Sequence, residues 1–250
     1  MKRKVELNIK SVHVIALDTI EMTLINKYVA KTAIPGQFLH LLVDGHTLRR
    51  PISIANADCK NNEITILFKI VGDGTKQLAA YKPGMSIDAL GPSGNGFSYD
   101  GKSNSVLLVG GGIGIPPLYN LGKTLRNNGI NVTSVLGFQS KEHVFYEENF
   151  RELGKTYIVT NDGTYGYQGF VTSVMDEIED FDTYYSCGPV PMLKAVTKQL
   201  QNHSGYISLE ERMGCGVGAC FACVIPTDSH GGYKKICKDG PVFAADEVIL

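Results

Sequence analysis

Four of the six cysteines lie close together near the C-terminal end and have the spacing of metal-cluster ligands. They follow the pattern C-x4-C-x2-C-x13-C and are Cys215, Cys220, Cys223 and Cys237. The first three match the plant-type spacing for a 2Fe–2S cluster, in which four thiolates hold two irons. Gly216 and Gly218 permit the positive φ angles with which backbone N–H groups can turn toward sulfur. Structural zinc is the alternative, although zinc sites commonly pair two short cysteine knuckles, whereas here three cysteines share one loop.

A second set of residues that could bind a ligand lies in the N-terminal part of the chain. Arg49-Arg50-Pro51-Ile52-Ser53 is followed by the glycine turn Gly72-Asp73-Gly74-Thr75. An arginine can neutralise a pyrophosphate, and a glycine turn can bring N–H groups close to phosphate oxygens. Alone, the first segment would be an ordinary strand with an exposed arginine. Together the two segments are what a flavin site on a β-barrel would need.

A third candidate site is a glycine run that ends a buried strand and opens a helix. Its glycines are Gly110, Gly111, Gly112 and Gly114. Backbone N–H groups at a helix start suit the pyrophosphate of a dinucleotide. The run departs from the Rossmann fingerprint, because Pro117 replaces the third glycine and no acidic residue ends the next strand. Cys187-Gly188-Pro189 ends a later strand on the same rim, where a nicotinamide could lie.

The sequence patterns of the segments that position these residues predict a β-barrel followed by an α/β domain. Residues 1–100 contain short Val-, Ile- and Leu-rich runs separated by turns, which predicts an antiparallel barrel. Residues 101–205 alternate strands with helices, which predicts a doubly wound parallel sheet for nucleotide binding. Helices are expected at PPLYNLGKTLRNNG, EENFREL, FVTSVMDEIED and VPMLKAVTKQLQNH. Residues 206–250 form a small C-terminal subdomain around the cysteines.

Composition excludes several classes of protein. The 24 basic and 25 acidic side chains leave a formal charge of −1, which argues against a nucleic-acid binder. No apolar run approaches the ~20 residues of a membrane helix. The N-terminus lacks the uninterrupted apolar core of a signal peptide. We therefore expect a cytoplasmic protein without stable membrane insertion, in which reduced cysteines favour metal binding over disulfides.

The combination resembles the ferredoxin–NADP reductase superfamily. The resemblance rests on the Arg-x-x-Ser motif, the GGGIGIPPL segment and the CGP strand end. The chain differs from that superfamily at Ile52, where the superfamily commonly has tyrosine. EERMGCGVGACFACV, the single Cys237, RRPISI and the DGTYGYQG loop are further similar to the electron-transfer subunits of dihydroorotate dehydrogenase B. This resemblance covers essentially the full length.

The resemblance implies FAD, a 2Fe–2S cluster, NAD(H) as co-substrate and no catalytic acid or base. The implied cluster ligands are the four cysteines, and the implied flavin contacts are Arg50, Pro51, Ile52, Ser53, Leu67, Phe68, Lys69, Gly74 and Thr75. The implied partner is an FMN-containing catalytic subunit, two copies of each forming a heterotetramer in pyrimidine (UMP) biosynthesis. Electrons would pass from dihydroorotate through FMN, the cluster and FAD to NAD+. Glu210 and Glu211 are expected near the flavin, without an assigned role.

Three other functions are compatible with parts of the sequence. A flavin and iron–sulfur subunit of an NADH-dependent ferredoxin reductase or sulfide dehydrogenase would share the layout and serve a different partner. A reductase feeding an oxygenase would usually carry a complete ferredoxin domain. A zinc-stabilised binding protein that senses nucleotides would be colourless. Lys141 also leaves room for a 2′-phosphate, so the residues alone do not decide between NADH and NADPH.

Overall fold

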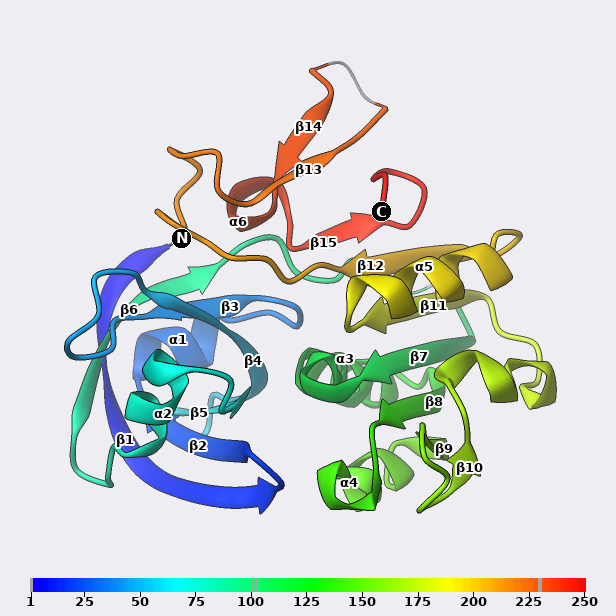
Figure 1. Cartoon of the computed structure of the whole chain (residues 1–250), viewed down its shortest axis with the longest axis horizontal. Coiled ribbons are helices and arrows are strands. Elements are labelled where there is room, and N and C mark those ends of the chain that lie inside the picture. The colour runs from blue at the N-terminus through cyan, green and yellow to red at the C-terminus, as the bar shows by residue number, and fades with distance from the viewer. Residues whose placement is uncertain (1, 100, 102, 229–230) are drawn as a thin grey trace.

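The computed structural model describes residues 2–99, 101, 103–228 and 231–250, which form three parts (Figure 1). A β-barrel and an α/β domain lie side by side, and a small segment covers one end of both. None of the helices within the described residues has the length and apolar character needed to span a bilayer.

Six antiparallel strands close the barrel in the order β1-β2-β5-β4-β3-β6. They are β1 (Arg3–Ala16), β2 (Thr19–Ile25), β3 (Phe38–Leu41), β4 (Arg50–Asp58), β5 (Glu63–Lys69) and β6 (Ser86–Ser93). Two short helices, α1 (Lys27–Thr32) and α2 (Asp73–Ala79), occupy connections. Because successive strand residues face opposite sides, Leu39, Leu41 and Ile54 fill the barrel core. The alternate residues of β3 and β4 face outward, toward the rest of the molecule.

The α/β domain is a seven-stranded sheet in the order β10-β9-β8-β7-β11-β12-β15. Its strands are β7 (Ser105–Gly111), β8 (Asn131–Phe138), β9 (Gly154–Thr160), β10 (Tyr167–Gln168), β11 (Thr183–Cys187), β12 (Ser204–Ser208) and β15 (Val242–Ala244). All pair in parallel except β15, which runs antiparallel to β12. Helices α3 (Ile115–Asn127) and α4 (Glu147–Arg151) pack on one face, and η3 (Val171–Glu177) and α5 (Val190–Gln199) pack on the other. The predicted barrel and doubly wound sheet are confirmed.

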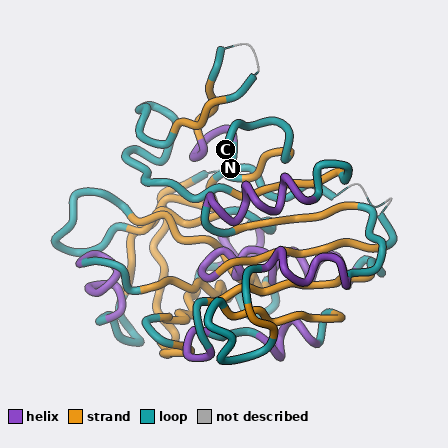
Figure 2. The backbone as a smooth tube through the Cα atoms, turned by 45° about the vertical axis from the view of Figure 1, so that its right-hand side comes forward, coloured by secondary structure: helices purple, strands orange, loops and turns teal. Residues whose placement is uncertain are grey.

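The C-terminal segment protrudes above both domains, and the N-terminus lies beside it (Figures 1 and 2). It contains a two-stranded sheet of β13 (Val224–Pro226) and β14 (Tyr233–Lys235), then α6 (Ile236–Asp239). The division expected after residue 205 falls inside β12, and β15 returns to the large sheet. The division expected after residue 100 falls at residues 100 and 102, which are outside the described residues. We propose the same three-part division, with the cluster segment inserted between β12 and β15.

Two local predictions differ from the structure. FVTSVMDEIED forms the 3-10 helix η3 rather than an α-helix, since the β-branched Val171, Thr172 and Val174 restrict helical side-chain rotamers. The expected turn at residues 72–75 instead opens α2, with Gly72 as its N-cap. The sixth strand, β6 (Ser86–Ser93), closes the barrel between β3 and β1.

Candidate functional site

The four clustered cysteines form two pairs. The Cys220 N–H donates to Cys215 Sγ at 3.3 Å, and the Cys215 N–H donates to Cys220 Sγ at 3.4 Å. Cys223 and Cys237 are buried, and their thiols share a hydrogen bond. Two pairs of thiols fit a two-iron cluster, in which each iron takes two thiolates. Within the described residues, no three His, Cys, Asp or Glu side chains converge as ligands for a single metal ion.

The loop around the first pair, residues 214–223, stabilises thiolate. Burial pushes the pKa of Cys215 up, but N–H donors from Val217, Cys220 and Ala219 outweigh it and lower the pKa to about 6. The Val217 N–H lies 3.4 Å from Cys215 Sγ. Burial, followed by the neighbouring Cys223, raises the pKa of Cys237 to about 11. We call residues 214–223 the cluster loop.

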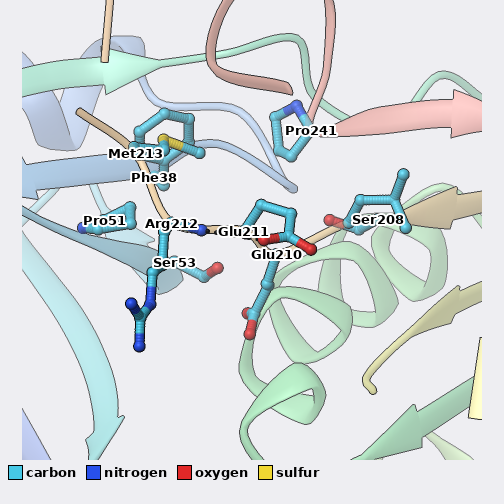
Figure 3. A pocket seen from close by; sticks show the side chains of 10 residues that line it. Phe38, Pro51, Ser53, Ser208, Glu210, Glu211, Arg212, Met213 and Pro241 are labelled. Atoms are coloured by element: carbon cyan, nitrogen blue, oxygen red, sulfur yellow. Dashed lines mark hydrogen bonds between the residues drawn. The ribbon is translucent and has the colours of Figure 1, made fainter. Parts of the chain in front are cut away.

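A cavity of about 400 Å³ lies between the barrel and the segment that follows β12. We call it the flavin cavity. The outward-facing Phe38, Pro51 and Ser53 line its barrel side, and Glu210 and Met213 line the opposite side (Figure 3). Ser208, Glu211 and Arg212 also line it, so apolar and polar groups share the cavity wall, and cofactor sites commonly combine the two. This lining fits a planar ring system with one polar edge, as in a flavin.

Arg50 lies at the start of β4, where its side chain is fixed on three sides. Its guanidinium donates to the carbonyl of Leu48 and contacts His46 Nδ1 at 3.0 Å. A Cβ atom added to Gly74 would lie 2.4 Å from the guanidinium, so a side chain at this position would displace the guanidinium. The structure thus joins the two predicted phosphate-binding segments. A preorganised guanidinium beside a helix start fits a pyrophosphate.

The other expected flavin residues lie in different surroundings. Phe68 and Ile52 pack with the barrel core, and Leu67 packs between the barrel and the α/β domain. Thr75 uses its hydroxyl locally, accepting from the N–H groups of Val71 and Gly72. Lys69 lines a second, larger cavity. For Ile52, Leu67 and Phe68, any flavin contact would therefore involve the backbone.

The second cavity, of about 660 Å³, runs along the carboxyl ends of the parallel strands. We call it the nucleotide cavity. Its lining includes Gly111, Gly112, Gly114, Gly188 and Pro189. Gly112 has a φ of +50°, and a Cβ there would meet no atom within 4 Å, so its bare backbone borders open space. A Cβ on Gly114 would lie 2.4 Å from the Cys187 carbonyl oxygen, which shows that the two predicted motifs touch. These features fit a dinucleotide pyrophosphate.

Two of the residues expected to bind the nucleotide, Gly110 and Cys187, do not line this cavity but lie in the core beside it. Gly110 faces the core, where a Cβ would lie 2.7 Å from Ile115. Cys187 is fully buried. Burial, and then the charge of Glu210, raises the pKa of its thiol, so it stays neutral, and it is hydrogen-bonded to Ser208.

Glu210 lines both cavities and joins them. It interacts with Ser53 of the flavin cavity and lies near Cys187 of the nucleotide motif. The surrounding protein desolvates its carboxyl and raises its pKa to about 7, although the hydrogen bond with Ser53 acts in the opposite direction and lowers the pKa. The side chain is still exposed to the open cavities, so water screens this effect until they are filled. Sequence reasoning expected Glu210 near the flavin and missed its place between the two sites.

Two family models match the chain. The iron-sulfur cluster binding domain of dihydroorotate dehydrogenase B matches residues 210–249. The oxidoreductase NAD-binding domain matches residues 108–198. The first range contains the cluster loop and Glu210, and the second contains the glycine run and the end of β11.

Curated relatives and solved structures agree with these matches. The chain is 52% identical to the dihydroorotate dehydrogenase B (NAD(+)), electron transfer subunit of Shouchella clausii, over 94% of both chains. It is 52% identical to the same subunit of Bacillus pumilus, over 99% of both. A structure of NADH-dependent reduced ferredoxin-NADP oxidoreductase is 32% identical, with a TM-score of 0.90, over 97% of this chain and 89% of that one. The ferredoxin reductase in carbazole 1,9a-dioxygenase shares the fold, with a TM-score of 0.69 and 21% identity over 80% of this chain and 66% of that one.

Proposed function

Because this chain belongs to the family of dihydroorotate dehydrogenase B electron transfer subunits, we propose that it passes electrons from a catalytic partner subunit to NAD+. The observation that carries the proposal is the sharing of Glu210 by the flavin and nucleotide cavities. A flavin, when bound, exchanges electrons singly with an iron–sulfur cluster and in pairs with a nicotinamide. The chain therefore has to hold these groups in the order cluster, FAD and NAD(H).

We propose the following roles for its residues. Arg50, with Gly74 and Thr75, holds the FAD pyrophosphate, and Pro51 and Ser53 border the ring, supported by Ile52 and Leu67 to Lys69. The glycines at 110–112 and 114 hold the dinucleotide pyrophosphate, while Cys187, Gly188 and Pro189 position the nicotinamide. Two thiol pairs, Cys215 with Cys220 and Cys223 with Cys237, hold the 2Fe–2S cluster.

The partner follows from the family. We propose that it is an FMN-containing subunit that oxidises dihydroorotate in pyrimidine biosynthesis, and that two copies of each subunit assemble. A cytoplasmic location agrees with four cysteines that must stay reduced before they bind iron.

A ferredoxin-linked reductase is the second candidate, since one such structure has a TM-score of 0.90 with this chain. The 52% identity to dihydroorotate dehydrogenase B subunits, against 32% to that structure, favours dihydroorotate as the electron donor.

The test is reconstitution under anaerobic conditions with a dihydroorotate-oxidising partner subunit. Dihydroorotate should reduce NAD+ only when both subunits are present, with one NADH formed per orotate. Reduced ferredoxin should not replace dihydroorotate and the partner. If ferredoxin supports NAD+ reduction and dihydroorotate with the partner does not, the second candidate is correct.

Against the expectation that no side chain acts as an acid or base, we propose that Glu210 supplies a proton and so gives this reaction a pH dependence. NAD+ reduction by electrons that arrive singly consumes one proton, and a carboxyl with a pKa of about 7 holds a proton below that pH and loses it above. We expect the wild-type rate to fall as pH rises through about 7. Glu210→Gln should lower the rate below pH 7 by about 100-fold and abolish the inflection.

The measurement is the rate of dihydroorotate-dependent NADH formation between pH 5.5 and 8.5. Glu152→Gln, at the exposed end of α4, is the control and should keep the wild-type profile. An unchanged inflection in Glu210→Gln would mean that another group, and not Glu210, causes it.

A further inference from the structure

His40, on β3, is a buried histidine to which the proposed function gives no role. Its side chain has no exposed surface, and neither ring nitrogen has a hydrogen-bond partner among the described residues. Native proteins seldom leave a buried polar group unsatisfied, because its desolvation is then uncompensated. The backbone of Arg49 interacts with the ring, but no partner satisfies either ring nitrogen within ordinary hydrogen-bond geometry. The ring N–H is therefore left without a well-formed hydrogen bond.

The register of the barrel places His40 next to the flavin cavity. Residues directly opposite one another in an antiparallel pair project to the same face. Phe38 lies opposite Ser53, and His40 lies opposite Pro51. Phe38, Pro51 and Ser53 all line the flavin cavity. His40 thus extends the outward face that holds the flavin by one step along β3.

The other side of the ring contacts the cluster loop. A Cβ atom added to Gly216 would lie 2.1 Å from His40 Nδ1, so the imidazole packs directly on the backbone that follows Cys215. The φ of Gly216 is +65°, a conformation that also favours glycine. Lys2 Nζ donates to the Gly216 carbonyl at 2.5 Å. His40 and Lys2 therefore hold the same residue of the loop from two sides.

The surroundings keep the ring neutral. Burial, and then the charge of Arg49, lowers the pKa of His40 to about 4. The nearby charges of Lys2 and Arg50 act in the same direction. A neutral imidazole carries one N–H donor and one bare nitrogen. Sulfur atoms of an anionic iron–sulfur cluster are acceptors for such a donor.

We propose that His40 is a positioning residue for the iron–sulfur cluster, whose ring N–H donates a hydrogen bond to a sulfur atom of the bound cluster beside the flavin cavity. The inference rests on the proposed function only in that the four cysteines bind a 2Fe–2S cluster. A hydrogen bond to a cluster sulfur stabilises the more negative, reduced state. His40 should therefore raise the reduction potential of the cluster.

The first test uses the wild-type protein with its cluster. The protein is labelled with ¹⁵N in histidine only, reduced, and studied by electron spin-echo envelope modulation of the cluster EPR signal. We expect a ¹⁵N coupling from one imidazole, and its loss in His40→Phe. A reduced-cluster signal without any histidine coupling would overturn the proposal. Absence of a 2Fe–2S signal in the wild type would instead contradict the proposed function.

The second test is an EPR-monitored redox titration of three variants. His40→Phe keeps a ring without the donor, and the reduced fraction at a given potential should fall about tenfold, which is ~59 mV for one electron. His40→Asn retains an N–H near the position of Nδ1 and should recover part of this shift. His203→Phe, whose ring stacks on Phe181, should not shift the potential. Equal shifts in His40→Phe and His40→Asn would mean that packing alone acts, and would refute the donor role.

Discussion

Cys220→Ser is expected to stop dihydroorotate-dependent reduction of NAD+ while leaving reduction of the flavin by NADH intact. Cys220 is paired with Cys215 through two N–H···S hydrogen bonds, so one iron would lose a thiolate. Mutation of a residue that only hydrogen-bonds to a metal ligand typically lowers metal affinity or activity by about 10–100-fold. Loss of a ligand should therefore cost more than about 100-fold. The nucleotide and flavin cavities contain none of the four cysteines, which is why the NADH reaction should continue.

The two activities are measured on the same preparation. Dihydroorotate with NAD+ reports the full path, and NADH with ferricyanide reports the flavin alone. Cys59→Ser is the matched control, because Cys59 is exposed in the turn between β4 and β5 and should keep both activities. Full dihydroorotate-dependent activity in a Cys220→Ser protein that lacks cluster iron would remove the cluster from the path.

Arg50→Ala is expected to weaken FAD binding by about 10- to 150-fold. A hydrogen bond to a charged group contributes about 1.5–3 kcal/mol. The Arg50 guanidinium is already fixed by Leu48 and His46 and packed against Gly74. Little conformational entropy is then lost when phosphate binds. Arg50→Lys should recover only part of the affinity, since an ammonium lacks the planar fork of a guanidinium.

The measurement is the dissociation constant of FAD, from flavin fluorescence on adding it to the FAD-depleted protein. Arg126→Ala, on the exposed side of α3, removes an arginine that bonds Asn131 and should not change this constant. Wild-type affinity in Arg50→Ala would mean that the pyrophosphate lies elsewhere.

Features that depend on local spacing could be predicted from the sequence. The cysteine spacing indicated a two-iron cluster, and the structure arranges the thiols in two pairs. Alternating short strands indicated the barrel, and alternating strands and helices indicated the doubly wound sheet. The glycine run and the Cys187 motif were both placed on one rim because parallel strands end at the same edge of a sheet.

Features that depend on long-range register could not be predicted. Ser53, Cys187 and Glu210 come from three distant segments, and only the packing of barrel against sheet brings them together. Ile52 and Phe68 lie in two separate segments expected to contact flavin, but strand alternation turns their side chains toward the barrel core. The contact of His40 with Gly216 likewise depends on where the cluster loop packs. A lone histidine in a short strand gives no local signal of that contact.

We expect this one chain to connect NAD(H), FAD and a 2Fe–2S cluster. An anaerobic titration of the purified subunit with NADH, followed by visible absorption and low-temperature EPR, tests it most directly. NADH should bleach the flavin and produce a rhombic EPR signal from a reduced 2Fe–2S cluster. Bleaching without an EPR signal, with zinc in place of iron by metal analysis, would contradict it.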